Sequence, residues 1–161
     1  MGKMTIKIED ATEQDLDQIL RLQKRAFHGQ ALIYNDFSLS PLTQTMDDLK
    51  KEFKQKAIYK VEQDGRIIAS IRCYLKDNIL YIEKLIVDPD FQNRGIGTGI
   101  MREVETRYSH IVDRFSLFTG DKSASNIRLY KKLGYKEIRW EPTGRDFMLI
   151  YMEKNNESNR P

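Results

Sequence analysis

The chain has 161 residues, of which 40% are hydrophobic and 32% are charged, and its formal net charge is only +3. This length fits one compact domain, and the absence of a basic run excludes the usual electrostatic footprint of a nucleic-acid-binding protein. A single cysteine excludes an internal disulfide, and no apolar run is long enough to span a membrane, so we expect a cytoplasmic protein without a nucleic-acid or membrane partner.

The first third of the chain predicts one short strand and two helices. β-branched and polar residues alternate over Thr5–Glu9, which is typical of a strand. An apolar stripe at helical spacing follows over Leu16–Phe27, and Gly29 is expected to end that helix. After a polar stretch, a second apolar pattern over Met46–Phe53 predicts another helix, with much of its surface in water.

The period of the apolar residues then changes to two, which predicts an antiparallel meander. Its first two strands, Ile58–Glu62 and Ile67–Leu75, are joined by the turn Asp64-Gly65. A third strand, Ile79–Val87, ends at Asp88-Pro89 because proline cannot donate to a strand ladder.

Helices and strands alternate in the second half of the chain. The pattern predicts helices over Gly95–Tyr108 and Ser125–Leu133, with a strand near Phe115–Thr119 between them. Two further strands, Tyr135–Trp140 and Phe147–Met152, close the sequence of elements. The expected fold is therefore α/β, with a mixed, mostly antiparallel sheet and helices on both of its faces.

Domain organisation is expected to be simple. Residues 1–153 carry the periodic patterns and form a single domain, whereas the polar residues 154–161 have no period and are expected to be a flexible tail.

The segment between the third meander strand and the next helix has the composition of an anion-binding loop. Gly95 and Gly97 stand at the helix start, where bare backbone N–H groups and the helix dipole attract a phosphate, and Arg94 adds a side-chain donor. A dinucleotide-binding fingerprint fails because Ile100 stands where a glycine is needed. No Lys followed by Ser or Thr stands at the spacing of a Walker A loop, so that motif is also excluded.

The pattern Q-x-x-G-x-G after a V-D-P strand end, followed later by N-I-R-L-Y-K-K-L-G-Y, resembles the GNAT superfamily of N-acetyltransferases. The resemblance implies the GNAT-like acyl-CoA N-acyltransferase fold, in which the central sheet is splayed in a V, and acetyl-CoA as cosubstrate. It also implies that Gln92–Gly97 hold the pyrophosphate of the coenzyme and that Leu85–Val87 pair with its pantetheine arm. The predicted coenzyme-binding residues are Leu85, Ile86, Val87, Gln92, Asn93, Arg94, Gly95, Ile96, Gly97, Thr98, Asn126 and Tyr130.

Acetyl transfer from a thioester to an amine needs a base, an acid and a donor to the developing oxyanion. The resemblance implies that Tyr130 is the acid, although its ring also suits simple core packing. Ser123 stands where the family commonly has an asparagine, and either it or Ser125 also suits a helix cap. A backbone N–H near Ile86 or Val87 is the expected oxyanion donor.

Glu83 is the candidate base because it lies in the strand that borders the predicted coenzyme site. The alternative is a salt-bridged strand glutamate, with Lys84 or Lys60 as its partner. Cys73 alternates in phase with apolar neighbours and is expected to be buried, and no pair of histidines has the spacing of metal ligands, so no metal is expected.

The leading functional hypothesis is an acetyl-CoA-dependent N-acetyltransferase that acts by direct attack of a primary amine in a ternary complex. The acceptor, a small molecule or a peptide, is expected to enter past Gly29–Pro41 and Glu141–Asp146. The alternative is an acetyl-CoA-binding regulatory or interaction module without turnover. By analogy with the family, a homodimer is also compatible with the sequence.

Overall fold

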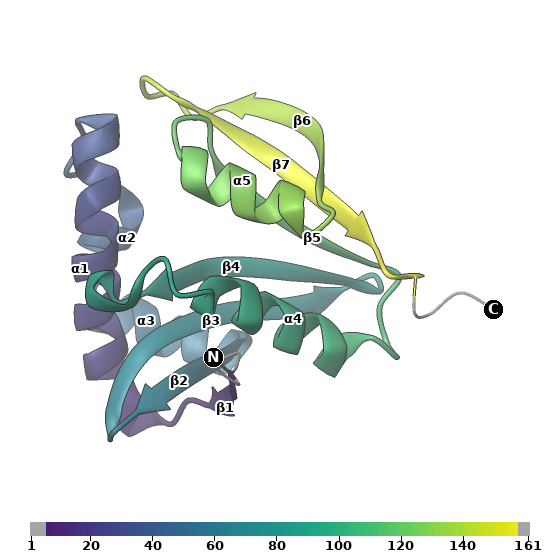
Figure 1. The fold of residues 1–161 in the computed structure, drawn as a ribbon. Helices are drawn as coiled ribbons and strands as arrows, with labels where there is room; N and C mark the ends of the chain where they lie inside the picture. The colour runs from purple at the N-terminus through teal and green to yellow at the C-terminus, as the bar shows by residue number, and fades with distance from the viewer. Residues whose placement is uncertain (1–5, 158–161) are drawn as a thin grey trace.

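A computed structural model describes residues 6–157, and in this range seven strands form one sheet in the order β1-β2-β3-β4-β5-β7-β6 (Figure 1). The strands are β1 (Glu9–Asp10), β2 (Ala57–Gln63), β3 (Arg66–Lys76), β4 (Ile79–Val87), β5 (Arg114–Gly120), β6 (Lys136–Pro142) and β7 (Met148–Asn155). The helices are α1 (Leu16–Tyr34), α2 (Ser40–Thr43), α3 (Met46–Gln55), α4 (Ile96–Tyr108) and α5 (Ala124–Lys132), with short 3₁₀ turns at Glu13–Asp15 and Pro89–Phe91. The predicted mixed, mostly antiparallel α/β class is confirmed, because β4–β5 is the one parallel pair among the described strands.

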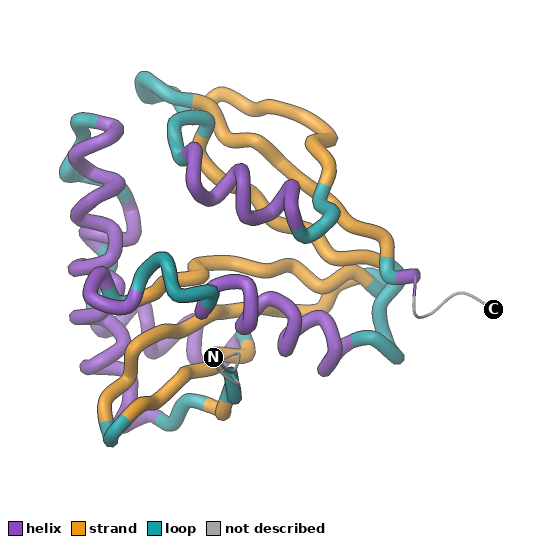
Figure 2. The backbone as a smooth tube through the Cα atoms, viewed as in Figure 1, coloured by secondary structure: helices purple, strands orange, loops and turns teal. Residues whose placement is uncertain are grey.

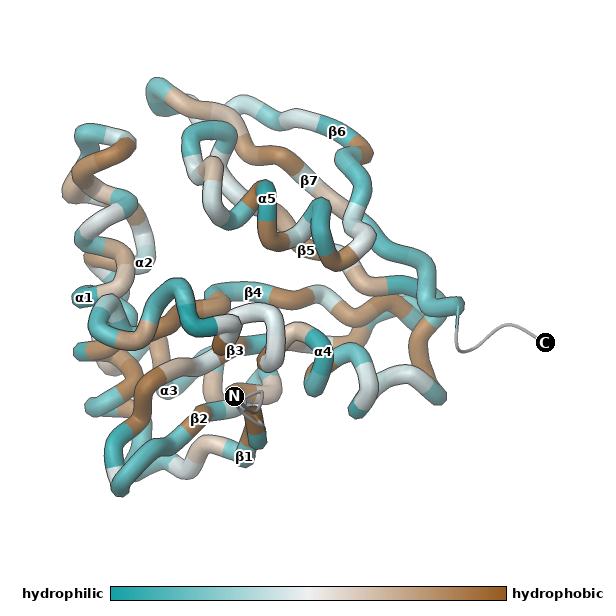
Figure 3. The backbone as a smooth tube through the Cα atoms, viewed as in Figure 1, coloured by the Kyte–Doolittle hydropathy of each residue, from teal (hydrophilic) through white to brown (hydrophobic). Residues whose placement is uncertain are grey.

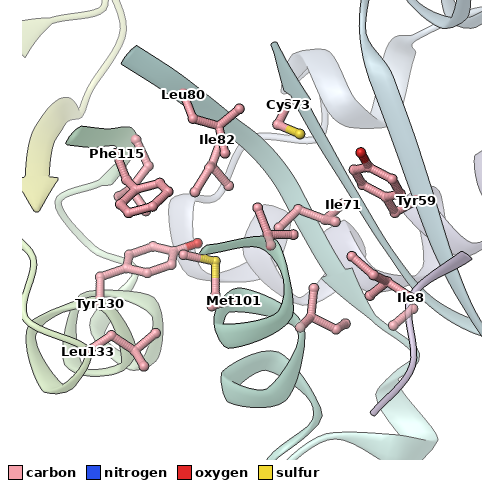
Figure 4. Packing of buried hydrophobic residues seen from close by; sticks show 14 of the residues in the cluster. Ile8, Tyr59, Ile71, Cys73, Leu80, Ile82, Met101, Phe115, Tyr130 and Leu133 are labelled. Atoms are coloured by element: carbon pink, nitrogen blue, oxygen red, sulfur yellow. The ribbon is translucent and has the colours of Figure 1, made fainter. Parts of the chain in front are cut away.

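Helices cover both faces of the sheet, as the helical and strand segments of Figure 2 show. Leu16, Ile19 and Leu49 of α1 and α3 pack with Ile58 and Ile67 of the sheet in one apolar core. A larger core on the other face contains buried residues of α4 and α5, part of which Figure 4 shows. Apolar segments lie mainly on the strands in Figure 3, whereas the loop before α4 is hydrophilic.

The sheet opens between its two central strands. β4 and β5 are paired only over Ile79–Tyr81 and Arg114–Ser116, after which they diverge (Figure 1). Residues 82–87 of β4 therefore have no partner residue in β5. This opening is the V-shaped splay that the family resemblance implies.

Helix α1 is longer than the sequence pattern predicts. Gly29 does not end it, and the helix continues to Tyr34, where Asn35 adopts a left-handed φ of 49° as its C-cap. The extension has a clear cause, since Ala31 and Tyr34 are buried and continue the apolar stripe. As a result α1 stands across the open end of the V in Figure 1.

The predicted strand at Thr5–Glu9 is wrong in its position, since β1 is only Glu9–Asp10, and Thr5 lies outside the described residues.

The tail boundary at residue 154 also needs correction. β7 continues to Asn155, and Lys154 Nζ forms an ion pair with Glu105 Oε1 at 2.7 Å. Asn156 is buried and its side-chain amide donates to the backbone oxygens of Ser109 and Val112. The ordered part of the described chain therefore extends beyond residue 153.

Candidate active site

The glycine loop forms an open helix N-terminus. α4 begins at Ile96, and its N-cap Gly95 has a left-handed φ of 79°, a conformation that costs a residue with a Cβ about 1–2 kcal/mol. As a glycine, Gly95 has no side chain to cap this helix, which leaves the first backbone N–H groups of α4 facing the loop for a ligand to bind. A Cβ at Gly97 would lie 3.5 Å from Leu129 Cδ2 and 3.7 Å from Leu85 Cδ2, which places it on the wall of a cavity.

A buried carboxylate fixes the start of this loop. Asp88 is 1% exposed, and its Oδ1 accepts a hydrogen bond from the backbone N–H of Asp90 at 2.9 Å. Arg25 and Arg66 form ion pairs with Oδ2. Burial alone raises the pKa of Asp88, but the Asp90 N–H and the two arginines outweigh it, so the pKa lies below its ordinary value.

A cavity of 310 Å³ lies where β4, α4, α5 and α1 meet. Ten of the predicted coenzyme-binding residues line it: Leu85, Ile86, Val87, Gln92, Asn93, Gly95, Ile96, Gly97, Thr98 and Asn126. Arg94 does not line this cavity, and its guanidinium lies over the Phe91 ring at 5.1 Å from the ring centroid. We refer to this space as the loop cavity.

A second cavity of 430 Å³ adjoins the first, and we refer to it as the inner cavity. The two share Phe27, Gln30, Leu85 and Asn126 as lining residues. Glu83 and Tyr130, the candidate base and acid, both line the inner cavity. The structure thus brings the two predicted catalytic side chains to one space next to the loop cavity.

Tyr130 is buried, and its ring extends from α5 toward Ile82 and Met101 (Figure 4). The ring packs edge-on against Tyr135, with 6.0 Å between the centroids, so part of the alternative of core packing also holds. Burial raises the pKa of Tyr130 to about 12. The hydroxyl is therefore protonated at neutral pH, which is the state that a general acid needs.

Glu83 forms an ion pair, but with a partner that the sequence did not suggest. Lys56 Nζ lies 3.0 Å from Glu83 Oε2. Lys84 is bound instead to Glu52, at 3.1 Å. Lys60 is bound to carboxylates on β2 and at the start of α1. No hydrogen bond to Glu83 Oε1 occurs within residues 6–157, so this oxygen can accept a proton from a ligand.

β4 has a bulge beside the inner cavity. Ser70 is paired with Ile86 and Arg72 with Glu83, so a single β3 residue, Ile71, faces both Lys84 and Leu85. Lys84 has a left-handed φ of 48°. A regular strand turns consecutive residues to opposite faces, and this bulge lets Glu83, Lys84 and Leu85 all line one cavity.

Hydrogen bonds connect α1 to the other half of the sheet at the open end of the V. The Ser123 and Tyr34 hydroxyls are 2.7 Å apart, and Ser123 Oγ donates to Gln30 Oε1 at 2.7 Å. Ser123 is the N-cap residue of α5, but its side chain does not cap that helix, so the predicted capping role is wrong for this residue. A Cβ at Gly120 would lie 2.0 Å from the Tyr34 hydroxyl, so only glycine permits this approach.

Several cavity residues were not predicted from the sequence. Phe27 lies on the apolar stripe of α1 that was expected only to pack in the core, but it lines both cavities. Gln30 also lines both cavities, because α1 continues past Gly29, and Lys84 lines the inner cavity through the bulge. Apolar residues of β5 and the C-terminal hairpin complete the inner cavity: Phe118, Phe147 and Leu149. In the sequence, these three residues belong to apolar strand patterns, which predict burial but not a place in a cavity. Of the two segments proposed for the acceptor, both contribute, with Tyr34 and Arg145 among the lining residues.

Three comparisons relate this chain to known proteins. The sequence profile described as "Acetyltransferase (GNAT) family" matches residues 16–135. The S-(2-succino)cysteine N-acetyltransferase of Bacillus subtilis (strain 168) is 30% identical over 154 residues, which cover 89% of this chain and 92% of that protein.

Solved structures share the fold. The PaiA N-acetyltransferase from Thermoplasma acidophilum, in complex with coenzyme A, has a TM-score of 0.80 at 18% identity and covers 94% of this chain and 99% of its own. The ribosomal-protein-S18-alanine N-acetyltransferase from Escherichia coli has a TM-score of 0.76 at 17% identity, with 93% of each chain covered. Within residues 6–157, no helix has the length and apolar character that a membrane crossing needs.

Proposed function

Because the chain belongs to the GNAT family of acetyltransferases and is an acetyl-CoA-dependent N-acetyltransferase, we propose that a primary amine attacks the acetyl group directly in a ternary complex. The observation that carries this proposal is the pair of adjoining cavities beside the unpaired edge of β4. The loop cavity has the backbone amides of a helix N-terminus, and the inner cavity has the carboxylate of Glu83 and the neutral phenol of Tyr130. Because the two cavities adjoin and share lining residues, their two substrates can meet.

The loop cavity fits the coenzyme side of the reaction. The uncapped amides of Ile96, Gly97 and Thr98 suit a pyrophosphate, and the missing Cβ of Gly97 leaves room for its approach. Residues 85–87 have no partner in β5, so their free backbone edge suits the amide groups of a pantetheine arm. Arg94 lies over the ring of Phe91, and we assign it a supporting role in binding the phosphate groups.

Bound acetyl-CoA supplies an activated acetyl thioester, so the protein needs no nucleophilic side chain of its own. We assign Glu83 as the base that takes a proton from the attacking amine through its unbound Oε1. Tyr130 donates its phenolic proton to the departing thiolate as the new C–N bond forms and the C–S bond breaks. A backbone N–H near Ile86 or Val87, on the edge that β5 leaves open, donates to the developing oxyanion.

The acceptor belongs to the inner cavity, which is lined by residues of the two segments expected to admit it. The Bacillus subtilis relative is named for S-(2-succino)cysteine, a modified amino acid with one primary amine. We propose this compound as one candidate acceptor, beside other small-molecule amines and peptide amino termini. Family membership does not favour the alternative of a coenzyme-binding module without turnover.

The test is an amine panel assayed by the release of free thiol from acetyl-CoA. Because removal of a general base typically lowers the rate by about 10²- to 10⁴-fold, we expect the kcat of Glu83→Gln to fall within that range. Tyr130→Phe is expected to lower kcat with little change in acetyl-CoA affinity. Glu62→Gln and Tyr81→Phe are the matched controls, since both residues lie on the sheet outside the two cavities. A Glu83→Gln enzyme within about threefold of the unmodified enzyme contradicts the assigned base.

A further inference from the structure

Five charged side chains form a cluster beside the inner cavity, and two of them, Glu83 and Lys84, line it. Glu52 accepts from Arg72 Nη1 at 2.7 Å and lies 3.1 Å from Lys84 Nζ and 3.5 Å from Lys56 Nζ. Lys56 also reaches Glu83, as described above. We call these residues the charge cluster, and they come from α3 and its C-terminal end, β3 and β4: Glu52, Lys56, Arg72, Glu83 and Lys84.

The charge cluster has one positive charge in excess, because three cations face only two carboxylates. Arg72 is 1% exposed and the other four side chains are 17–19% exposed, so solvent screens the cluster poorly. The remaining partners of Arg72 are the neutral side chains Gln23 and Gln44. Burial and, second to it, the neighbouring Arg72 lower the pKa of Lys84, although Glu52 and Glu83 oppose this shift.

Lys84 is the only cation of the charge cluster that lines the inner cavity. Arg145 lines the same cavity, but Asp36 neutralises it at 2.7 Å. Lys84 shares its partner Glu52 with Arg72 and Lys56, so an anion that enters the cavity meets the excess positive charge of the cluster at Lys84. The bulge at this residue also places it directly beside Glu83, the base assigned above.

We propose that Lys84 binds a carboxylate of the acceptor and thereby selects free α-amino acids over amines without a carboxylate and over peptide amino termini. This inference rests on the proposed function. In an α-amino acid the amine and the carboxylate are attached to the same carbon, so a carboxylate at Lys84 brings the amine next to Glu83. A peptide amino terminus lacks that carboxylate and leaves the excess charge uncompensated.

The experiment compares amino acids with their α-carboxamides: phenylalanine with phenylalaninamide, and glutamate with its α-amide. Steady-state thiol release gives kcat/KM for each, and calorimetry with coenzyme A present gives the affinity without turnover. We expect each acid to exceed its amide at least about tenfold, the effect of one hydrogen bond to a charged group. Lys84→Gln removes the preference through KM for the acid, with KM for acetyl-CoA unchanged, whereas Lys84→Arg retains part of it.

Lys60→Gln is the matched control, because Lys60 is a partly buried lysine with two carboxylate partners that lies outside both cavities. Lys84→Gln leaves two cations against two carboxylates, so we expect a folded variant, which circular dichroism checks. Equal kcat/KM and equal affinity for acids and amides, or an equal loss of both in Lys84→Gln, overturns the inference. Binding preference without any thiol release contradicts the proposed function and leaves the inference supported.

Discussion

Gly97→Ala separates the stability of the fold from coenzyme binding. Gly97 is the second residue of α4, and an alanine Cβ would meet Leu129 and Leu85 only at ordinary contact distances of 3.5 and 3.7 Å. Replacement of a helical glycine by alanine stabilises by up to about 0.5–1 kcal/mol, which raises the Tm of a chain of this size by ~1–4 °C. The same Cβ would lie on the wall of the loop cavity, where we expect it to displace the phosphate of the proposed coenzyme site from the helix amides.

The expected loss of affinity follows from the contacts at that helix end. A hydrogen bond to a charged group contributes about 1.5–3 kcal/mol, so displacement from one amide weakens coenzyme A binding by about 10- to 150-fold. Calorimetry measures the Kd, and a thermal melt without ligand measures the Tm. The predicted result is a variant that is at least as stable as the unmodified protein and binds coenzyme A poorly.

Gly29→Ala is the matched control for this substitution. Gly29 also lies within a helix and lines neither cavity, and beyond its own helix no atom of residues 6–157 lies within 4 Å of an added Cβ. It is expected to gain the same order of stability, about 0.5–1 kcal/mol, with unchanged coenzyme A affinity. Unchanged affinity in Gly97→Ala, or an equal change in both variants, refutes the assignment of the α4 N-terminus as the phosphate site.

Three further predictions concern the rest of the fold. Gly99→Ala is expected to destabilise by about 1–3 kcal/mol in a denaturant titration, since its Cβ would lie 2.4 Å from Ile6 Cγ1, and a neutral effect contradicts that packing. Burial raises the pKa of Cys73 to about 11, so a thiol reagent at pH 8 should modify it only after unfolding, and rapid labelling of the native protein contradicts this. The lowered pKa of Asp88 contributes stability that is present above its ordinary value of 3.8 and is lost as pH falls through the folded-state value, so Asp88→Asn should show a shallower acid loss of stability than the unmodified protein.

The order of elements could be predicted because each depends on local patterns. Alternation and the turn Asp64-Gly65 define the hairpin, and the structure gives both turn residues a positive φ. The coenzyme-binding residues that the family resemblance implies also gather at one place, since ten of the twelve line the loop cavity. Helix length was misjudged at Gly29 because burial of Ala31 and Tyr34 outweighs the low helix propensity of one glycine.

The residues that sequence reasoning missed depend on tertiary geometry. A bulge follows from the pairing of two strands, and nothing in the order Glu83-Lys84-Leu85 indicates that all three line one cavity. The partner of Glu83 was missed for the same reason, since Lys56 lies on the connection from α3 and meets β4 only in the folded chain.

The position of the gap in the sheet follows from how its two halves are held. Beyond the three paired residues of β4 and β5, no strand pairing among the described residues joins the two halves of the sheet, so their separation depends on what lies at the open end. There, Tyr34 and Gln30 of α1 bind Ser123 at the start of α5, while the same helix packs on β3 and β4 (Figure 1). A helix bound to both halves fixes the width of the opening. The two cavities share Leu85 in their linings, so a fixed opening also fixes their position relative to each other, as the proposed direct transfer between two bound substrates requires.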